Sequence, residues 1–365
     1  MNSFPEGNAI IYCEGCFQTP RGKTAHGLVR GTKRYHVLSV VESHCASKDA
    51  GVILDGHANG VLIYRDVEEA VGAARKNGDP ASHLVIGLAP DGGRFNDDAR
   101  SDIMKTIRMG LHIDSGLHDF LSEDFESAQL ASNCRIRIRD IRKSPPRQDL
   151  HFFSGKIQEV TALKVAVLGT DSAVGKRTTA WGIVDALQAA GCAVEFIGTG
   201  QTSWMQGCRY GIMLDALIND FVSGEIEHIV WTAWKESQPQ VIVIEGQGSL
   251  MNPAYPGGYE ILAAGRPDVV ILQHAPARQE YDGFPGYPIH SLGKQIEAIE
   301  LLSGKPVVAV TLNHEKLDVR QVSMACEQIR KDTGLPACDI LLHGASQIVH
   351  ALMPYLERSK EGAIG

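Results

Sequence analysis

The chain has 365 residues, which at about 150 residues per domain favours two domains. A composition of 44% hydrophobic and 21% charged residues is that of a globular protein and excludes disorder, collagen and coiled coil. The formal net charge of −8 gives no overall basic field for nucleic acid or an anionic membrane. No apolar run approaches the roughly 20 residues that span a bilayer and no signal-peptide pattern begins the chain, so we expect a soluble, cytoplasmic protein.

In the first part of the chain, short apolar runs alternate with helical stretches. Strands are predicted over residues 9–13, 36–41, 60–64 and 84–88. Helices are predicted over residues 67–77 and 97–109, with Asp66 and Asn96 as their N-terminal caps. Residues 135–139 read Arg-Ile-Arg-Ile-Arg, an alternation that favours an antiparallel strand with one solvated face. The pattern predicts a Rossmann-like α/β domain over residues 1–150.

Pro145 and Pro146 mark a linker, because adjacent prolines exclude helix and central strand. The second domain, residues 151–365, repeats the alternation with stronger strands. These are predicted over residues 164–168, 193–197, 241–244, 269–272, 307–312 and 339–342. The helices between and after them are predicted over residues 175–190, 212–221, 294–303, 319–333 and 345–358. Near-continuous apolar strands separated by helices predict a doubly wound, mostly parallel sheet covered on both faces.

Residues 169–179 carry the strongest motif, Gly-Thr-Asp-Ser-Ala-Val-Gly-Lys-Arg-Thr-Thr. The motif follows a buried strand and opens a helix, which is the context of a phosphate-binding P-loop. Backbone amides and the helix N-terminus converge there on phosphate oxygens, and a lysine adds a mobile cation. The residues predicted to bind phosphate are Gly169, Thr170, Asp171, Gly175, Lys176, Arg177 and Thr178.

Arg177 departs from the usual P-loop, in which Ser or Thr after the lysine binds Mg²⁺. Thr178 is one residue further along the helix, so its hydroxyl is rotated by about 100°. We therefore expect a site that holds phosphates with amides and protein cations rather than through a metal. This argues against ATP hydrolysis as the function. It fits a ligand whose phosphates serve for binding and do not react, such as coenzyme A.

Ligands of doubly wound sheets bind beyond the carboxyl ends of the strands. Glu245 follows one such strand, and can act as a general base, bind Mg²⁺ or cap the loop. His274 and Arg278 follow another, where His274 can carry a proton or be a core imidazole. Arg278 can clamp a substrate carboxylate or form a surface ion pair. Lys23, in the sequence Gly22-Lys23-Thr24, is a possible ligand contact from the first domain.

The Lys-Arg-Thr-Thr loop, together with Tyr12-Cys13-Glu14-Gly15 and Gly22-Lys23-Thr24-Ala25-His26-Gly27-Leu28, resembles a two-domain P-loop family that includes the D-glutamate N-acetyltransferases. More distantly, the loop and Glu245-Gly246-Gln247-Gly248 resemble the dethiobiotin synthetase branch of P-loop proteins. The first resemblance implies transfer of an acetyl group from acetyl-CoA to the amine of an acidic amino acid, D-glutamate. No metal is required for that chemistry.

The implied reaction needs a base and cations for the substrate carboxylates. Glu245 is the first choice of base, with Asp171 and His274 as alternatives. Arg278 and Arg209, or Lys23 with Arg21, are the choices for the carboxylates. Two alternatives stay open, an ATP- and Mg²⁺-dependent ligase-like enzyme and a non-catalytic nucleotide or CoA sensor. We also expect a homo-oligomer.

Overall fold

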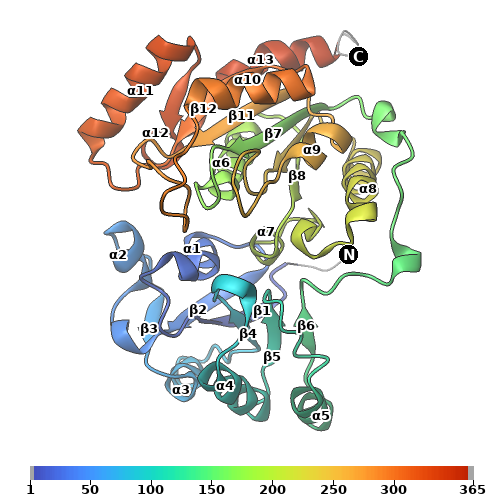
Figure 1. The fold of residues 1–365 in the computed structure, drawn as a ribbon. Coiled ribbons are helices and arrows are strands. Elements are labelled where there is room, and N and C mark those ends of the chain that lie inside the picture. The colour runs from blue at the N-terminus through green and yellow to red at the C-terminus, as the bar shows by residue number, and fades with distance from the viewer. Residues whose placement is uncertain (1–3, 361–365) are drawn as a thin grey trace. The chain divides into compact units, whose positions relative to one another are not determined.

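The computed structural model describes residues 4–360, which form two compact units (Figure 1). The first unit contains the chain up to Ser144 together with Gln201–Gly207, and the second contains Pro145–Gly200 and the chain from Cys208 onward. The chain thus passes from one unit to the next inside the predicted proline linker. The sequence patterns did not predict that Gln201–Gly207 belong to the first unit.

The first unit is built on a six-stranded sheet whose neighbouring strands are all parallel. In sheet order the strands are β3 (Leu62–Tyr64), β2 (Tyr35–Val41), β1 (Gly7–Tyr12), β4 (His83–Ile86), β5 (His112–Ser115) and β6 (Ile138–Asp140). The order 3-2-1-4-5-6 is that of a Rossmann fold, which confirms the predicted fold class of this unit.

Helices cover both faces of this sheet (Figure 1). They are α1 (Lys23–Arg30), α2 (Ala50–Asp55), α3 (Val67–Lys76), α4 (Asp97–Arg108), α5 (Phe125–Cys134) and α7 (Gln201–Met205). Helix α1 lies beside α2 and α7, whereas α3 and α5 lie beside α4. The predicted caps are confirmed, because Asp66 accepts from the Glu69 amide and Asn96 from the Ala99 amide.

The segment that returns to the first unit is held there by its side chains. Met205 of α7 is fully buried in the core of this unit. The Thr24 and Thr202 hydroxyls lie 2.8 Å apart in a buried hydrogen bond between α1 and α7. The Arg34 guanidinium packs over the Trp204 ring at 3.5 Å from its centroid. Helix α7 is therefore part of this unit's packing, although it follows a strand of the other unit.

The prediction of an antiparallel strand over residues 135–139 is wrong. Arg135 adopts a left-handed conformation, with φ of 57°, and ends helix α5. Strand β6 begins only at Ile138, and it pairs parallel to β5. Strand β5 was not predicted, since its sequence His-Ile-Asp-Ser is too short and polar to stand out. The alternating charges reflect the end of a helix and a half-exposed edge strand.

The second unit is built on a seven-stranded sheet, again with parallel pairing throughout. In sheet order the strands are β13 (Ala337–Asp339), β12 (Val307–Leu312), β11 (Val269–His274), β7 (Leu163–Gly169), β10 (Val241–Glu245), β8 (Val194–Gly198) and β9 (Tyr210–Gly211). Strand β7 lies at the centre between β11 and β10. This arrangement confirms the predicted doubly wound fold.

The helices of the second unit are α6 (Lys176–Ala189), α8 (Asn219–Ser237), α9 (Tyr259–Ala264), α10 (Leu292–Ser303), α11 (Val319–Thr333), α12 (Ile340–His343) and α13 (Ser346–Lys360). Helices α8, α9 and α10 bury apolar side chains on one face of the sheet. Helices α6 and α13 pack together and against β7 on the other (Figure 1). No helix within residues 4–360 has the length and apolar character to cross a bilayer.

Two predicted elements of this unit are wrong. Residues 212–221 do not form one helix, because Leu214–Ala216 make a single 3₁₀ turn and α8 begins only at Asn219. Residues 339–342 do not form a strand. Strand β13 ends at Asp339, whose carboxylate accepts from the Leu341 and Leu342 amides and so starts helix α12. Short apolar runs are ambiguous between strand and helix, and here a capping aspartate decides.

Candidate functional site

The P-loop connects the central strand β7 to helix α6. Gly169 is the last residue of β7, and Gly175 is the N-cap of α6. Gly175 has φ of 103°, and Ala173 within the loop has φ of 51°. A side chain at position 175 would be strained in this conformation, so glycine is required there. Backbone turns with such left-handed residues are of the kind that form anion-binding concavities.

Lys176 begins α6 and folds back across the loop. Its side chain is buried, and Nζ donates to the carbonyls of Asp171 at 2.8 Å and Gly248 at 2.7 Å. Arg177 and Thr178 lie in the same first turn and are half-buried. Two cationic side chains thus add to the positive end of the helix, which makes this turn the cationic centre of the site.

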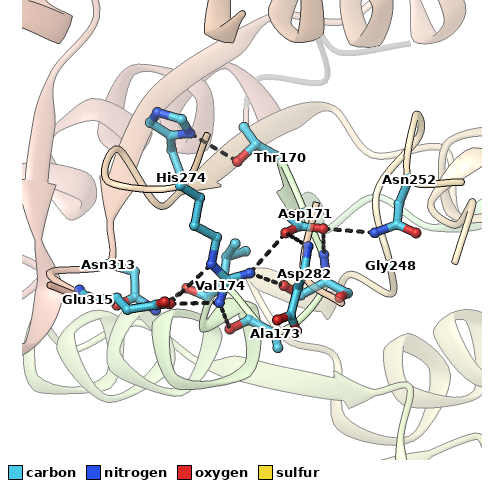
Figure 2. Close-up of polar contacts among 12 residues, drawn as sticks. Thr170, Asp171, Ala173, Val174, Gly248, Asn252, His274, Asp282, Asn313 and Glu315 are labelled. Carbon is cyan, nitrogen blue, oxygen red and sulfur yellow. Dashed lines mark hydrogen bonds and ion pairs between the residues drawn. The ribbon is translucent and has the colours of Figure 1, made fainter. Parts of the chain in front are cut away.

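Asp171 lies in the loop and is fully buried. Its Oδ1 accepts from the Ser172 amide at 2.7 Å and Asn252 Nδ2 at 2.8 Å. Its Oδ2 accepts from Arg278 at 2.9 Å and the Asp282 amide at 2.9 Å (Figure 2). Both carboxylate oxygens are therefore occupied by donors from the P-loop and two following loops. This environment suits a structural anchor rather than a proton acceptor.

Arg278 completes the same network, and three of its partners, Asp171, Ala173 and Glu315, are labelled in Figure 2. Its guanidinium donates five hydrogen bonds, to Asp171, Glu315 and the carbonyls of Ser172 and Ala173. Since a guanidinium has five N–H groups, every donor is used within the protein. Burial would lower the pKa of Arg278, but Glu315 and Asp171 raise it above its usual value. Arg278 thus holds the P-loop in shape, and its donors are not available to clamp a substrate carboxylate.

Strand β11 lies directly beside β7, and polar groups at its end hold the other side of the loop. The Gln273 amide group donates to the Val174 carbonyl at 3.1 Å, and Asn313 donates to the same carbonyl at 2.9 Å. The Thr179 hydroxyl donates to the Gln273 side chain. Sequence reasoning missed Gln273, Glu315 and Asn252 as loop supports. A glutamine that ends a buried apolar strand was the available signal for Gln273.

His274 ends β11 beside Thr170 of the loop. Its Nδ1 lies 3.0 Å from the Thr170 hydroxyl. Burial lowers the pKa of His274 to about 4. The imidazole is therefore neutral at pH 7, and it can exchange a hydrogen bond with Thr170 without adding charge to the site.

Glu245 ends β10, the strand on the other side of β7. The carboxylate is 5% exposed, and its Oε2 accepts from the Thr199 amide at 2.9 Å. The Thr199 hydroxyl donates to the Glu245 carbonyl at 3.0 Å and accepts from Gln247 at 3.0 Å. Because neighbouring strands are parallel, Glu245, Gly169 and His274 leave three adjacent strands at the same edge. The structure thus brings a carboxylate, the P-loop and a neutral imidazole to one edge.

Two predicted substrate contacts lie elsewhere. Arg209 is half-exposed and forms an ion pair at 2.9 Å with Glu236, near the carboxyl end of α8. That end of α8 leads into the amino end of β10, at the edge opposite the P-loop, so Arg209 is not brought to the site. Lys23 begins helix α1 and belongs to the first unit.

One group of potential metal ligands occurs among residues 4–360. Glu14, Glu42 and His44, all in the first unit, each offer a ligand atom, and these atoms lie within 4.8 Å of one another. The Glu42 carboxylate already accepts from the Phe17 amide at 3.1 Å and the His44 amide at 3.1 Å. Glu14 accepts from the Ser43 amide at 2.8 Å. These contacts fix the loops after β1 and β2, which explains the cluster without a metal.

Comparison with known proteins agrees with this architecture. Residues 43–144 match the DUF1611 N-terminal Rossmann-like domain, and residues 151–349 match the DUF1611 C-terminal P-loop domain, both described as domains of unknown function. A crystal structure of a DUF1611 family protein from Anabaena variabilis superposes with a TM-score of 0.88 at 28% identity, covering 95% of this chain and 99% of that one.

Two curated relatives are named for an enzyme activity. A D-glutamate N-acetyltransferase from Tritonibacter scottomollicae is 30% identical over 301 residues, which is 81% of this chain and 86% of the relative. A D-glutamate N-acetyltransferase from Pseudoalteromonas sp is 29% identical over 276 residues, or 74% of this chain and 80% of the relative. The chain belongs to the DUF1611 family of two-domain P-loop proteins, which includes the D-glutamate N-acetyltransferases.

Proposed function

We propose that this protein is an N-acetyltransferase that moves an acetyl group from acetyl-CoA to the amine of D-glutamate. The observation that carries this proposal is that helix α6, directly after the P-loop, begins with two successive cations, Lys176 and Arg177. Arg177 takes the position at which a nucleotide-hydrolysing P-loop has a metal-binding hydroxyl. The name of the two curated relatives supports an acyltransferase and supplies the substrate.

In this proposal the P-loop binds phosphates of CoA. The loop amides and the start of α6 bind phosphate oxygens, and Lys176 and Arg177 neutralise their charge. Arg278 and Asp171 act as positioning residues, because their hydrogen bonds are spent on the loop itself. The CoA phosphates serve only for binding and do not react, so no metal ion is required for the chemistry.

The reaction requires the substrate ammonium to lose a proton before its nitrogen attacks the thioester carbonyl. A C–N bond forms, the C–S bond breaks, and the CoA sulfur leaves as thiolate and takes up a proton. We assign the base to Glu245, which ends the strand beside the P-loop. Asp171 is a poor choice, since four donors occupy it. His274 is a weak base, because its pKa is about 4.

The test follows release of free thiol from acetyl-CoA, with D-glutamate or L-glutamate as acceptor. We expect release with D-glutamate, and a fall in kcat of about 100-fold or more in the Glu245→Gln variant with unchanged CoA affinity. The Glu225→Gln variant, changed in a carboxylate on α8, serves as the matched control and keeps kcat.

Two results would overturn the proposal. Affinity for ATP that depends on Mg²⁺, with no affinity for CoA, would support a ligase-like enzyme instead. CoA binding without turnover of any amino acid would leave a CoA sensor.

A further inference from the structure

Three aromatic side chains form a patch on two loops of the second unit. The aromatic patch consists of Tyr255 in the loop after β10 and of Phe284 and Tyr287 in the loop after β11. The Phe284 ring lies 6.4 Å from the Tyr255 ring and 6.4 Å from the Tyr287 ring, edge-on to both. Tyr255 is 54% exposed and Tyr287 is 55% exposed. Two rings are thus more than half exposed, and a third packs edge-on against both.

The loop that carries Tyr255 is fastened directly to the P-loop. The Tyr255 amide donates to Asn252 Oδ1 at 2.7 Å. Asn252 Nδ2 in turn donates to Asp171 at 2.8 Å, as Figure 2 shows. One buried asparagine therefore connects the backbone of Tyr255 to the P-loop carboxylate. Because Asn252 is only 2% exposed, this connection is protected from water.

A second connection runs through the P-loop lysine. Lys176 Nζ donates to the Gly248 carbonyl, and the backbone of Gly248 packs on that of Tyr255. A Cβ atom at Gly248 would lie 2.0 Å from the Tyr255 carbonyl oxygen, so this approach requires glycine. Tyr255 thus lies against Gly248, whose carbonyl accepts the hydrogen bond from Lys176.

The loop that carries Phe284 and Tyr287 is fastened to the same carboxylate. The Asp282 amide donates to Asp171 Oδ2 at 2.9 Å (Figure 2). Within the loop, the Phe284 amide donates to the Tyr281 carbonyl at 2.9 Å, and the Tyr281 amide to the Tyr287 carbonyl at 2.9 Å. These backbone bonds close the loop into a turn that is fastened to the P-loop carboxylate.

The charges around the patch restrict its ligand. Residues 248–259 and 279–290 contain no lysine or arginine, and Glu280 and Asp282 are acidic. An anionic membrane would be repelled by these carboxylates. A nucleobase is uncharged, has an apolar face, and stacks on aromatic side chains. In CoA one ribose joins the adenine base to the phosphates, so a base remains near phosphates held at the P-loop.

We propose that the aromatic patch stacks the adenine base of CoA while the P-loop binds its phosphates. This inference rests on the proposed function, because it takes CoA as the ligand. It assigns Tyr255 and Tyr287 as the stacking residues and Phe284 as the ring that supports them. The Asp171 carboxylate fixes the base subsite and the phosphate subsite relative to each other.

The test compares binding of CoA with binding of 4′-phosphopantetheine, which has a phosphate but no base. In the Tyr255→Ala/Tyr287→Ala double variant, we expect CoA to bind about 5- to 150-fold more weakly by calorimetry, the range for loss of one base–aromatic stack. Affinity for 4′-phosphopantetheine should stay within about twofold. The Tyr255→Phe/Tyr287→Phe variant should keep CoA affinity, since stacking needs the ring and not the hydroxyl. Phe125→Ala, which removes an exposed ring of the first unit, is the matched control.

Fluorescence of 1,N6-etheno-CoA gives a second readout, since stacking quenches the modified base. Quenching by the parent protein that is lost in the double alanine variant supports the proposal. Unchanged CoA affinity in that variant, or an equal loss of both ligands, overturns the base subsite. If acetyl transfer persists in that case, the proposed function stands. Failure of the parent protein to bind CoA overturns both.

Discussion

The first strand of each unit leads to a helix that begins at a lysine, Lys23 in α1 and Lys176 in α6. In the first unit a 3₁₀ turn precedes the helix, and Gly22 has φ of −90°. The Ala25 amide, in the first turn of α1, donates to the Gly87 carbonyl at 3.1 Å. In the second unit Gly175 has φ of 103°, and Arg278 and Gln273 brace the loop from outside, Arg278 partly through the loop's own Asp171.

A glycine and a lysine at the start of a helix therefore do not by themselves give the backbone conformation and the bracing of the P-loop. In α1 part of the helix start is satisfied by the chain's own backbone. In the P-loop the bracing side chains take the carbonyls of Ser172, Ala173 and Val174. These bonds hold the loop through its carbonyls, while the Thr170 amide donates to the Gln273 carbonyl and the Ser172 amide to Asp171. We therefore expect the bracing side chains, Arg278 and Gln273, to matter as much for ligand binding as the P-loop sequence itself.

The largest expected effects come from breaking two buried ion pairs, one in each unit. Arg278 pairs with Asp171 in the second unit, and Arg139 pairs with Asp114 at 2.7 Å in the first. Arg278→Met and Arg139→Met each leave a fully buried carboxylate unpaired, so we expect each to destabilise its own unit by about 3–5 kcal/mol in urea unfolding. Only Arg278→Met should also weaken CoA binding. Equal CoA affinity in both variants would contradict the bracing role.

The two lysines provide the next test. Lys176→Ala should weaken CoA binding by about 2–3 kcal/mol, or about 100-fold, because a charge-assisted phosphate contact is lost. Lys23→Ala should leave CoA affinity unchanged, because Lys23 belongs to the first unit. Calorimetry measures both affinities. A similar loss of CoA affinity in both variants would mean that the lysines are equivalent.

His274 makes the stability of the second unit sensitive to acid. Burial lowers the pKa of His274 to about 4, below the unfolded value of about 6.5. Between these values the unfolded chain binds the proton more readily, so stability is lost as pH falls below 6.5. The loss from this residue should be about 2 kcal/mol between pH 7 and pH 5. Urea unfolding of the His274→Gln variant should show an acid sensitivity smaller by that amount, and an identical slope would refute it.

The smallest expected effect concerns helix α7. Thr202→Val removes the buried hydroxyl contact with Thr24 and should cost about 1 kcal/mol of stability. The loss should appear in the unfolding of the first unit, with CoA affinity unchanged. Hydrogen exchange of α1 amides measures this locally. Destabilisation confined to the second unit would show that α7 belongs there.

Sequence reasoning reached the fold because long apolar strands and capped helices are local signals. Strand β12 and helix α11 have the predicted boundaries, and the P-loop lies between the predicted strand and helix. The sequence did not predict β5 or α12. Both elements are short, and a neighbouring strand or a capping residue determines whether a strand or a helix forms there. The P-loop residues were identifiable from spacing. The role of Arg278 was not, because its partners Asp171 and Glu315 are far apart in sequence.

The excursion of Gln201–Gly207 has a consequence for attempts to dissect the protein. A fragment that stops at Ser144 lacks α7, and would expose the surface of α1 that carries Thr24. Proteolytic cleavage near Pro145 would leave α7 on the fragment that carries the second unit. Neither unit is one continuous stretch of the chain, so we expect each unit to fold well only as part of the full chain.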